Sequence, residues 1–222
     1  MKLYSSDGKY NLDTSGRKAI NHGTYGKIYM YDDKTCFKVF KHLGFHNPEP
    51  IVVLNELELK NFYRIIDLLY DENLKYAGYL SDFYQKDNFN ILRDKEYLLD
   101  SVNNIYDGII ELTKKCILVN DLHKDNVVIN KDGIFVIDVD DYKHFNSDNT
   151  YMNTFRFKQM LKAILYDALI NYSSTTYRLI NNPDSYKLIR RLVDEDHTDI
   201  KHFNAVMKKY NRPIEYFSKV MK

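Results

Sequence analysis

The chain of 222 residues contains no tryptophan, four prolines, eight glycines and no excess of charge of either sign. Lysine and arginine number 32 against 31 aspartates and glutamates, which leaves a formal charge of +1. A chain this close to neutrality is not suited to coating nucleic acid or an anionic membrane surface. No apolar run approaches the ~18–20 residues that a membrane-spanning helix needs. No apolar segment follows Met1 either, so we expect neither a membrane span nor a secretory signal.

Cysteine is also scarce, which excludes a disulfide framework. The two cysteines, Cys36 and Cys116, both lie in apolar stretches. We predict that both are small buried hydrophobic residues in a reducing compartment. We therefore expect a cytoplasmic protein, with delivery into a host cell without a Sec-type signal as an open alternative.

Hydrophobic residues make up 44% of the chain and charged residues 28%, with 20 Tyr and 12 Phe among the aromatics. These proportions are typical of a folded globular chain. The periodicity of the first part predicts one helix at 51–62, which begins after Pro48 and Pro50. Strands are predicted at 27–31, 35–40, 65–70 and 76–80.

The second part of the chain is predicted to be predominantly helical. A hairpin is predicted where 127–129 meets 134–137, because the Asp-Gly pair between them tolerates positive φ. Helices are predicted at 95–115, 151–172, 184–194, 198–210 and 213–221. We therefore predict an α+β fold of two lobes within a single domain over residues 1–222. Its parts are a small β-rich N-lobe at about 10–82, a hinge at about 81–86 and a reduced helical C-lobe at about 87–222.

Two glycines three residues apart, Gly23 and Gly26, directly precede a predicted strand. Glycines in such a loop let backbone amides come close to phosphate oxygens. The same spacing is common in ordinary hairpin turns, so both interpretations stay open for this segment.

Lys38 lies inside an otherwise apolar strand, where alternation places it on the same face as Cys36 and Phe40. A lysine on an inward face needs a partner of opposite charge. A lysine on an edge strand that extends its ammonium group to solvent is the simpler alternative.

The strongest pattern is formed by Asp121, Asn126 and Asp138, which adjoin two apolar strands. The hairpin should bring Asn126 and Asp138 together, and oxygen ligands of this kind suit Mg²⁺ that also binds substrate phosphates. Asp121 comes just before them, where its carboxylate could orient a hydroxyl group. A solvated loop of turn-forming residues is the alternative, but it does not account for this spacing.

Together these motifs resemble those of the protein kinase-like superfamily. Asn21, Gly23, Gly26 and Ile28 match the family's glycine loop with its first glycine lost. The sequence Thr-Cys-Phe-Lys at 35–38 looks like the strand that carries the family's lysine.

The later motifs follow in the family's order. Asp121-Leu122, continuing to Asn126, looks like the catalytic loop, and Asp138 looks like the aspartate of the metal-binding Asp-Phe-Gly motif. The resemblance implies an enzyme, a phosphotransferase that uses ATP and Mg²⁺, with Mn²⁺ as an alternative ion. Asp121 would accept the proton of the acceptor hydroxyl, and Asn126 and Asp138 would hold the metal.

The same resemblance assigns the remaining site residues. Lys38 would contact the α- and β-phosphates, and the loop residues Asn21, Gly23, Gly26 and Ile28 would bind the nucleotide together with Asp82 at the hinge. The helix partner of Lys38 would be Glu56 or Glu58. We prefer Glu56, which is nearer the helix centre, and only one of the two can face Lys38.

The chain also departs from the family pattern. Val119-Asn120 replaces the usual His-Arg pair, and Asp140 replaces the glycine of Asp-Phe-Gly. Only about a dozen residues separate Asp138 from the helix predicted near Tyr151, so we expect no full activation segment. This layout is similar to the minimal Ser/Thr protein kinases that bacterial pathogens deliver into host cells. It implies phosphorylation of a protein hydroxyl without activation-loop control, and a host protein or an activating partner.

Three other functions stay open. His123 stands where Ser/Thr kinases have lysine, and in this respect the chain looks like small-molecule kinases of the aminoglycoside or choline type. The altered motifs also allow a pseudokinase that only binds, and transfer of AMP on the same fold stays open as well. We expect Tyr79 and Tyr84, near the hinge, to be core or to line the adenine pocket rather than to be phosphorylated.

Overall fold

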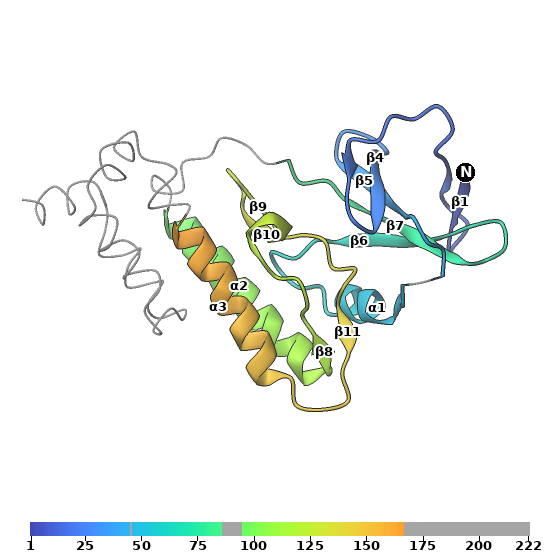
Figure 1. The fold of residues 1–222 in the computed structure, drawn as a ribbon. Coiled ribbons are helices and arrows are strands. Elements are labelled where there is room, and N and C mark those ends of the chain that lie inside the picture. The colour runs from blue at the N-terminus through green and yellow to red at the C-terminus, as the bar shows by residue number, and fades with distance from the viewer. Residues whose placement is uncertain (45, 86–94, 167–222) are drawn as a thin grey trace, which may run out of the picture.

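The computed structural model describes residues 1–44, 46–85 and 95–166 (Figure 1). The described part is an α+β structure with a curled antiparallel sheet and three α-helices, so the predicted class is confirmed. The helices predicted at 184–194, 198–210 and 213–221 lie outside the described residues, as does the end of the helix predicted at 151–172.

The main sheet has seven strands in the order β2-β1-β6-β7-β5-β4-β3. The strands predicted at 27–31, 35–40, 65–70 and 76–80 are confirmed, whereas the first two strands had no clear alternation to predict them. The strands are β1 (Lys2–Ser5), β2 (Asn11–Asp13), β3 (Asn21–His22), β4 (Gly26–Met30), β5 (Thr35–Phe40), β6 (Ile65–Tyr70) and β7 (Tyr76–Asp82).

Strand β5 lies inside the sheet, between β4 and β7, and is buried from Cys36 to Phe40. Phe37 and Val39 pack into a cluster with Leu3 and Leu12 of the first hairpin. Cys36 and Phe40 pack on the opposite face, with the helices. The predicted alternation is therefore confirmed, and the edge-strand interpretation of Lys38 is wrong.

Helix α1 (Glu49–Glu56) begins directly after Pro48, two residues before the predicted start at residue 51, so that Pro50 lies in its first turn. It is shorter than the predicted helix at 51–62, because the backbone enters the left-handed region at Glu58 and Asn61. Ile51 and Leu54 are its buried apolar contacts with the core. The helix therefore presents one short buried face and leaves its last residue, Glu56, exposed.

The other two helices, α2 (Lys95–Lys114) and α3 (Thr150–Tyr166), pack side by side (Figure 1). Their contact includes the rings of Tyr106 and Phe157, whose centroids are 5.2 Å apart. Gly108 of α2 makes room for the ring of Phe62, since a Cβ there would lie 2.5 Å from that ring. Segment 61–63, which leads into the sheet, therefore packs closely against α2.

Asn153 of α3 is a buried connector between that helix and the chain that follows α2. Its amide nitrogen donates to the Thr113 hydroxyl at 2.8 Å and to the Ile117 carbonyl at 2.9 Å. Its amide oxygen accepts from the backbone N–H of Val119 at 2.8 Å. Strand β8 (Ile117–Leu118), which pairs with β11 (Lys143–His144), is thus fixed to α3 just before Asp121.

The predicted hairpin is confirmed as β9 (Val127–Asn130) and β10 (Gly133–Val136), paired antiparallel. Val136 forms two backbone hydrogen bonds with the segment that precedes β6: its N–H donates to Asn61 at 2.8 Å and its carbonyl accepts from Tyr63 at 2.9 Å. The hairpin therefore lies between the sheet and the α2–α3 pair (Figure 1). Within the described ranges, no helix has the length and apolarity to cross a bilayer.

Gly78 of β7 provides a test of how closely β7 packs against β5. Its φ is +156°, and a Cβ there would lie 1.9 Å from the carbonyl oxygen of Lys38. We expect Gly78→Ala to lower the free energy of unfolding by about 2–4 kcal/mol, because strand β5 would have to move. Chemical denaturation measures the loss. Gly16→Ala is the control, because Gly16 also has a positive φ but no atom near the added Cβ; similar losses in both variants would contradict the close approach.

Candidate functional site

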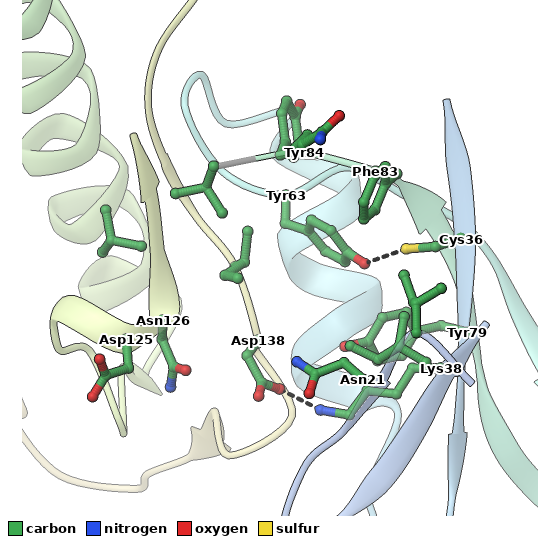
Figure 2. Close-up of a pocket in the computed structure, with 16 residues that line it drawn as sticks. Asn21, Cys36, Lys38, Tyr63, Tyr79, Phe83, Tyr84, Asp125, Asn126 and Asp138 are labelled. Atoms are coloured by element: carbon green, nitrogen blue, oxygen red, sulfur yellow. Dashed lines mark hydrogen bonds and ion pairs between the residues drawn. The ribbon is translucent and has the colours of Figure 1, made fainter. Parts of the chain in front are cut away.

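A cavity of about 480 Å³ opens between the sheet and the β9–β10 hairpin (Figure 2). One end is apolar and the other carries charged and amide groups. Its lining residues are Ile20, Asn21, Ile28, Cys36, Lys38, Tyr63, Tyr79, Phe83, Tyr84, Gln85, Asp125, Asn126, Val127, Val128, Ile137 and Asp138.

The apolar end is formed by the sheet and by the chain that leaves β7. Tyr84 lines this end, whereas Tyr79 lines the cavity beside its strand partner Lys38 (Figure 2), so both tyrosines line the cavity, as the sequence predicted. Phe83 and Gln85 also line it and were not predicted, although their place directly after a buried strand could have indicated them. This end suits a flat, largely apolar ring system.

A small polar cluster lies in the wall of this apolar end. The thiol of Cys36 lies 3.2 Å from the hydroxyl of Tyr63, and the hydroxyl of Ser81 donates to Tyr63. Burial raises the pKa of the Cys36 thiol, and the hydrogen bond to Tyr63 only partly offsets this effect. Cys36 is therefore a packing residue with an unreactive thiol.

At the polar end, Lys38 is paired with two carboxylates. Its ammonium nitrogen donates to Asp138 Oδ1 at 2.5 Å (Figure 2) and also forms an ion pair with Asp140. The Lys38 side chain is only 4% exposed. Burial alone would lower the pKa of Lys38, but Asp140 and Asp138 outweigh it, so the pKa is raised and the lysine is charged.

The two carboxylates differ in their surroundings. Asp138 lines the cavity and its side chain is 36% exposed, whereas the side chain of Asp140 is 1% exposed. Burial raises the pKa of Asp140 to about 7, although the neighbouring ammonium of Lys38 lowers it. Asp138 therefore faces the cavity, and Asp140 lies buried behind it.

Asp121 is held by two neighbours in the loop after β8. The Asn126 amide donates to Asp121 Oδ2 at 3.0 Å, and His123 Nε2 lies 3.1 Å from Oδ1. His123 Nδ1 accepts from the backbone N–H of Asp125 at 3.2 Å. This bond leaves the ring proton on Nε2, where it can be donated to Asp121. The short 3₁₀ helix η1 (Lys124–Asn126) that follows His123 thus fixes both side chains relative to Asp121.

Backbone conformation contributes to the same geometry. Asp121 and Asp138 both lie in the left-handed region, with φ of 60° and 59°. Aspartate tolerates this region better than most residues. The Ile137 N–H donates to the Asn126 carbonyl at 2.9 Å, so Asn126 and Asp138 occupy adjacent positions at the end of the hairpin.

The four predicted loop residues differ in their relation to the cavity. Asn21 and Ile28 line it, whereas Gly23 and Gly26 are not among its lining residues. Gly26 has a packing role, since a Cβ there would lie 2.6 Å from the Val39 carbonyl oxygen. Gly23 closes the turn through its N–H, which donates to the Gly26 carbonyl at 2.9 Å. Both the hairpin-turn interpretation and a phosphate-covering role are compatible with this loop.

Two predicted site residues are not where the sequence analysis put them. Glu56 is exposed at the end of α1, and the ion pairs of Lys38 run instead to Asp138 and Asp140. The predicted Lys38–Glu56 pair is wrong because Glu56 is exposed to solvent, whereas the buried residues of α1 are apolar. Asp82 is not among the residues that line the cavity; its carboxylate accepts two hydrogen bonds from Arg64 at 2.9 and 3.0 Å.

A divalent cation fits only part of this site. No group of three or more His, Cys, Asp or Glu side chains in the described ranges is arranged to hold a metal. Asn126 and Asp138 supply one amide oxygen and one carboxylate, which is the small ligand number that Mg²⁺ uses when phosphate oxygens complete its shell. The donor set therefore suits a cation that arrives with a phosphate ligand rather than a resident metal.

Comparison with models of known protein families finds none that matches the chain, and no curated protein matches it either. A function for the chain therefore rests on the geometry and chemistry of the site itself.

The two cysteines give a test of the described surface. Cys116 is exposed where the chain turns after α2, with φ of +58°, so its predicted burial is wrong; Cys36 is buried as predicted. We expect a maleimide dye to label one thiol per native chain quickly and the second only after unfolding. The Cys116→Ser variant should lose the fast phase and Cys36→Ser should retain it. Fast labelling of Cys116→Ser would contradict the enclosed wall of the cavity.

Proposed function

We propose that the chain is an ATP-dependent phosphotransferase with a two-lobed, protein kinase-like fold. The observation that carries the proposal is that Lys38, Asn126 and Asp138 line one cavity, and that Asp121, which is not among its lining residues, is hydrogen-bonded to Asn126. Lys38 comes from the sheet, Asp138 follows the hairpin, and Asn126 and Asp121 belong to the loop that precedes it. A lysine, two oxygen ligands for a cation and a hydrogen-bonded carboxylate are the groups that phosphoryl transfer requires.

The nucleotide is proposed to bind with its base in the apolar end, beside Phe83 and Tyr84, and with its phosphates toward Lys38. Two features support this orientation: the aromatic and aliphatic lining at one end and the buried ammonium at the other. Mg²⁺ held by Asn126 and Asp138 would neutralise charge on the phosphates. Lys38 would stabilise the same charge.

Asp121 is proposed to orient the acceptor hydroxyl and take its proton. Its side chain is 46% exposed, so an incoming group can reach it, while His123 and Asn126 fix its orientation. The open side of the carboxylate fits an acceptor presented on the surface of another protein, and we propose a protein hydroxyl as the substrate.

One observation favours a second candidate, a small-molecule kinase. His123 occupies the position where Ser/Thr kinases have lysine, and its Nε2 lies 3.1 Å from the Asp121 carboxylate, so it acts directly on that group. A screen of aminoglycosides and choline against generic protein substrates separates the two candidates, because only one class of acceptor should be labelled.

Removal of either carboxylate tests the chemistry. We expect Asp121→Asn and Asp138→Asn each to lower transfer of the γ-phosphate from labelled ATP by at least ~100-fold, since each removes a group that acts on the reacting atoms. Asp132→Asn is the control, because Asp132 is an exposed carboxylate in the β9–β10 turn. Retention of full activity by either site variant, with normal melting, would overturn the assignment.

Nucleotide binding is tested separately by thermal melting. ATP with Mg²⁺ at ~100 times its dissociation constant should stabilise the native chain by about 2.7 kcal/mol. Asp138→Asn should lose most of the additional shift that Mg²⁺ gives over ATP alone. A chain that melts at the same temperature with and without ATP is not a nucleotide-binding protein, whereas a shift without any transfer would identify a binding module.

A further inference from the structure

We propose that Asp140, rather than an acidic residue of helix α1, is the residue that positions Lys38 for the nucleotide phosphates. This inference rests on the proposed function and adds a positioning residue to it. Asp140 stands where the resembled family has a glycine, so its role does not follow from the motif. It forms an ion pair with Lys38 and is buried with it.

The two partners of Lys38 divide their roles by position. Asp138 lines the cavity, where it is open to a cation, whereas Asp140 is not among the lining residues and its side chain is 1% exposed. A cation that binds Asp138 would compete with the ammonium for that carboxylate. Asp140 remains as the carboxylate that holds Lys38, from the side away from the cavity.

The backbone around Asp140 supports a fixed position. Val139 is 1% exposed within the core, and its carbonyl accepts from the N–H of Tyr142 at 3.1 Å. Tyr142 is itself buried, and Asp140 therefore lies between two anchored residues. A carboxylate held in this way can hold a lysine without rearrangement, which is the property that positions a group before substrate arrives.

Helix α1 offers no equivalent group. Glu56 is exposed at the end of the helix, and Glu58 lies beyond it in the left-handed region. The buried face of α1 presents apolar side chains, Ile51 and Leu54 among them. Lys38 is thus held from the chain that follows the hairpin, and its orientation does not depend on a movement of α1.

The test compares ATP with adenosine, which lacks the phosphates that Lys38 would contact. We expect Asp140→Asn to weaken ATP binding at least tenfold and to leave adenosine binding within twofold. In a Lys38→Met background the same substitution should have no further effect on ATP, because Asp140 acts through Lys38. Glu56→Gln is the matched control and should bind both ligands as the native chain does.

The outcomes separate this inference from the proposed function. A native chain that binds neither ATP nor adenosine overturns both. A native chain that binds ATP, with Asp140→Asn unchanged or with equal losses for ATP and adenosine, overturns only the role of Asp140. An additive loss in the Lys38→Met background also overturns it.

Asp140→Asn could unfold the chain, since removal of one partner of a buried ion pair is costly. In that case Asp140→Glu is the second variant, because it keeps the charge but displaces the carboxylate by one methylene group. It should weaken ATP binding and leave adenosine binding unchanged, and equal affinities for ATP in Asp140→Glu and the native chain would overturn the inference.

Discussion

A buried ammonium group determines much of the arrangement of this molecule. Lys38 lies in a strand that is covered on both faces, so its charge has to be neutralised inside the protein. The neutralising groups, Asp138 and Asp140, come from a segment about 100 residues later in the chain. That segment can reach the lysine only if the β9–β10 hairpin is in place. The hairpin in turn packs against α2 and hydrogen-bonds to residues 61–63. One ion-pair cluster thus joins the sheet to the helices at the position where the cavity forms.

The sequence predicted the elements whose signals are local. Alternation identified the central strands, prolines marked the start of α1, and the Asp-Gly pair indicated the hairpin. The end of α1 was not predictable in this way, because it is set by left-handed residues that are not glycine. Strand β1 depends on pairing with β6, and β2 on pairing with β1, rather than on their own pattern. The exposure of Cys116 has the same kind of cause, since a turn outside α2 places it in solvent.

At the candidate site, the spacing of the motifs predicted which residues lie together, but it did not predict which groups hold each side chain. The hairpin brought Asn126 and Asp138 together as expected, whereas the partner of Lys38 was assigned to the wrong element. In the sequence, Asp138 and Asp140 look like a pair of surface carboxylates. Only the structure shows that Asp140 is buried. The orientation of His123 was equally hidden, because it depends on one backbone N–H, that of Asp125. Side-chain direction and burial are tertiary properties that a single sequence does not display.

The amide of Asn153 has a consequence for the loop that carries Asp121. Three hydrogen bonds from this one side chain join α3 to the end of α2, to β8 and to Val119. The candidate base therefore owes its rigidity to a helix that begins about thirty residues further along the chain. Opening of the segment 117–119, which leads into the loop, would break bonds that also dock α3, so we expect the two to open together. In this molecule the local stability of the candidate base is a property of helix packing.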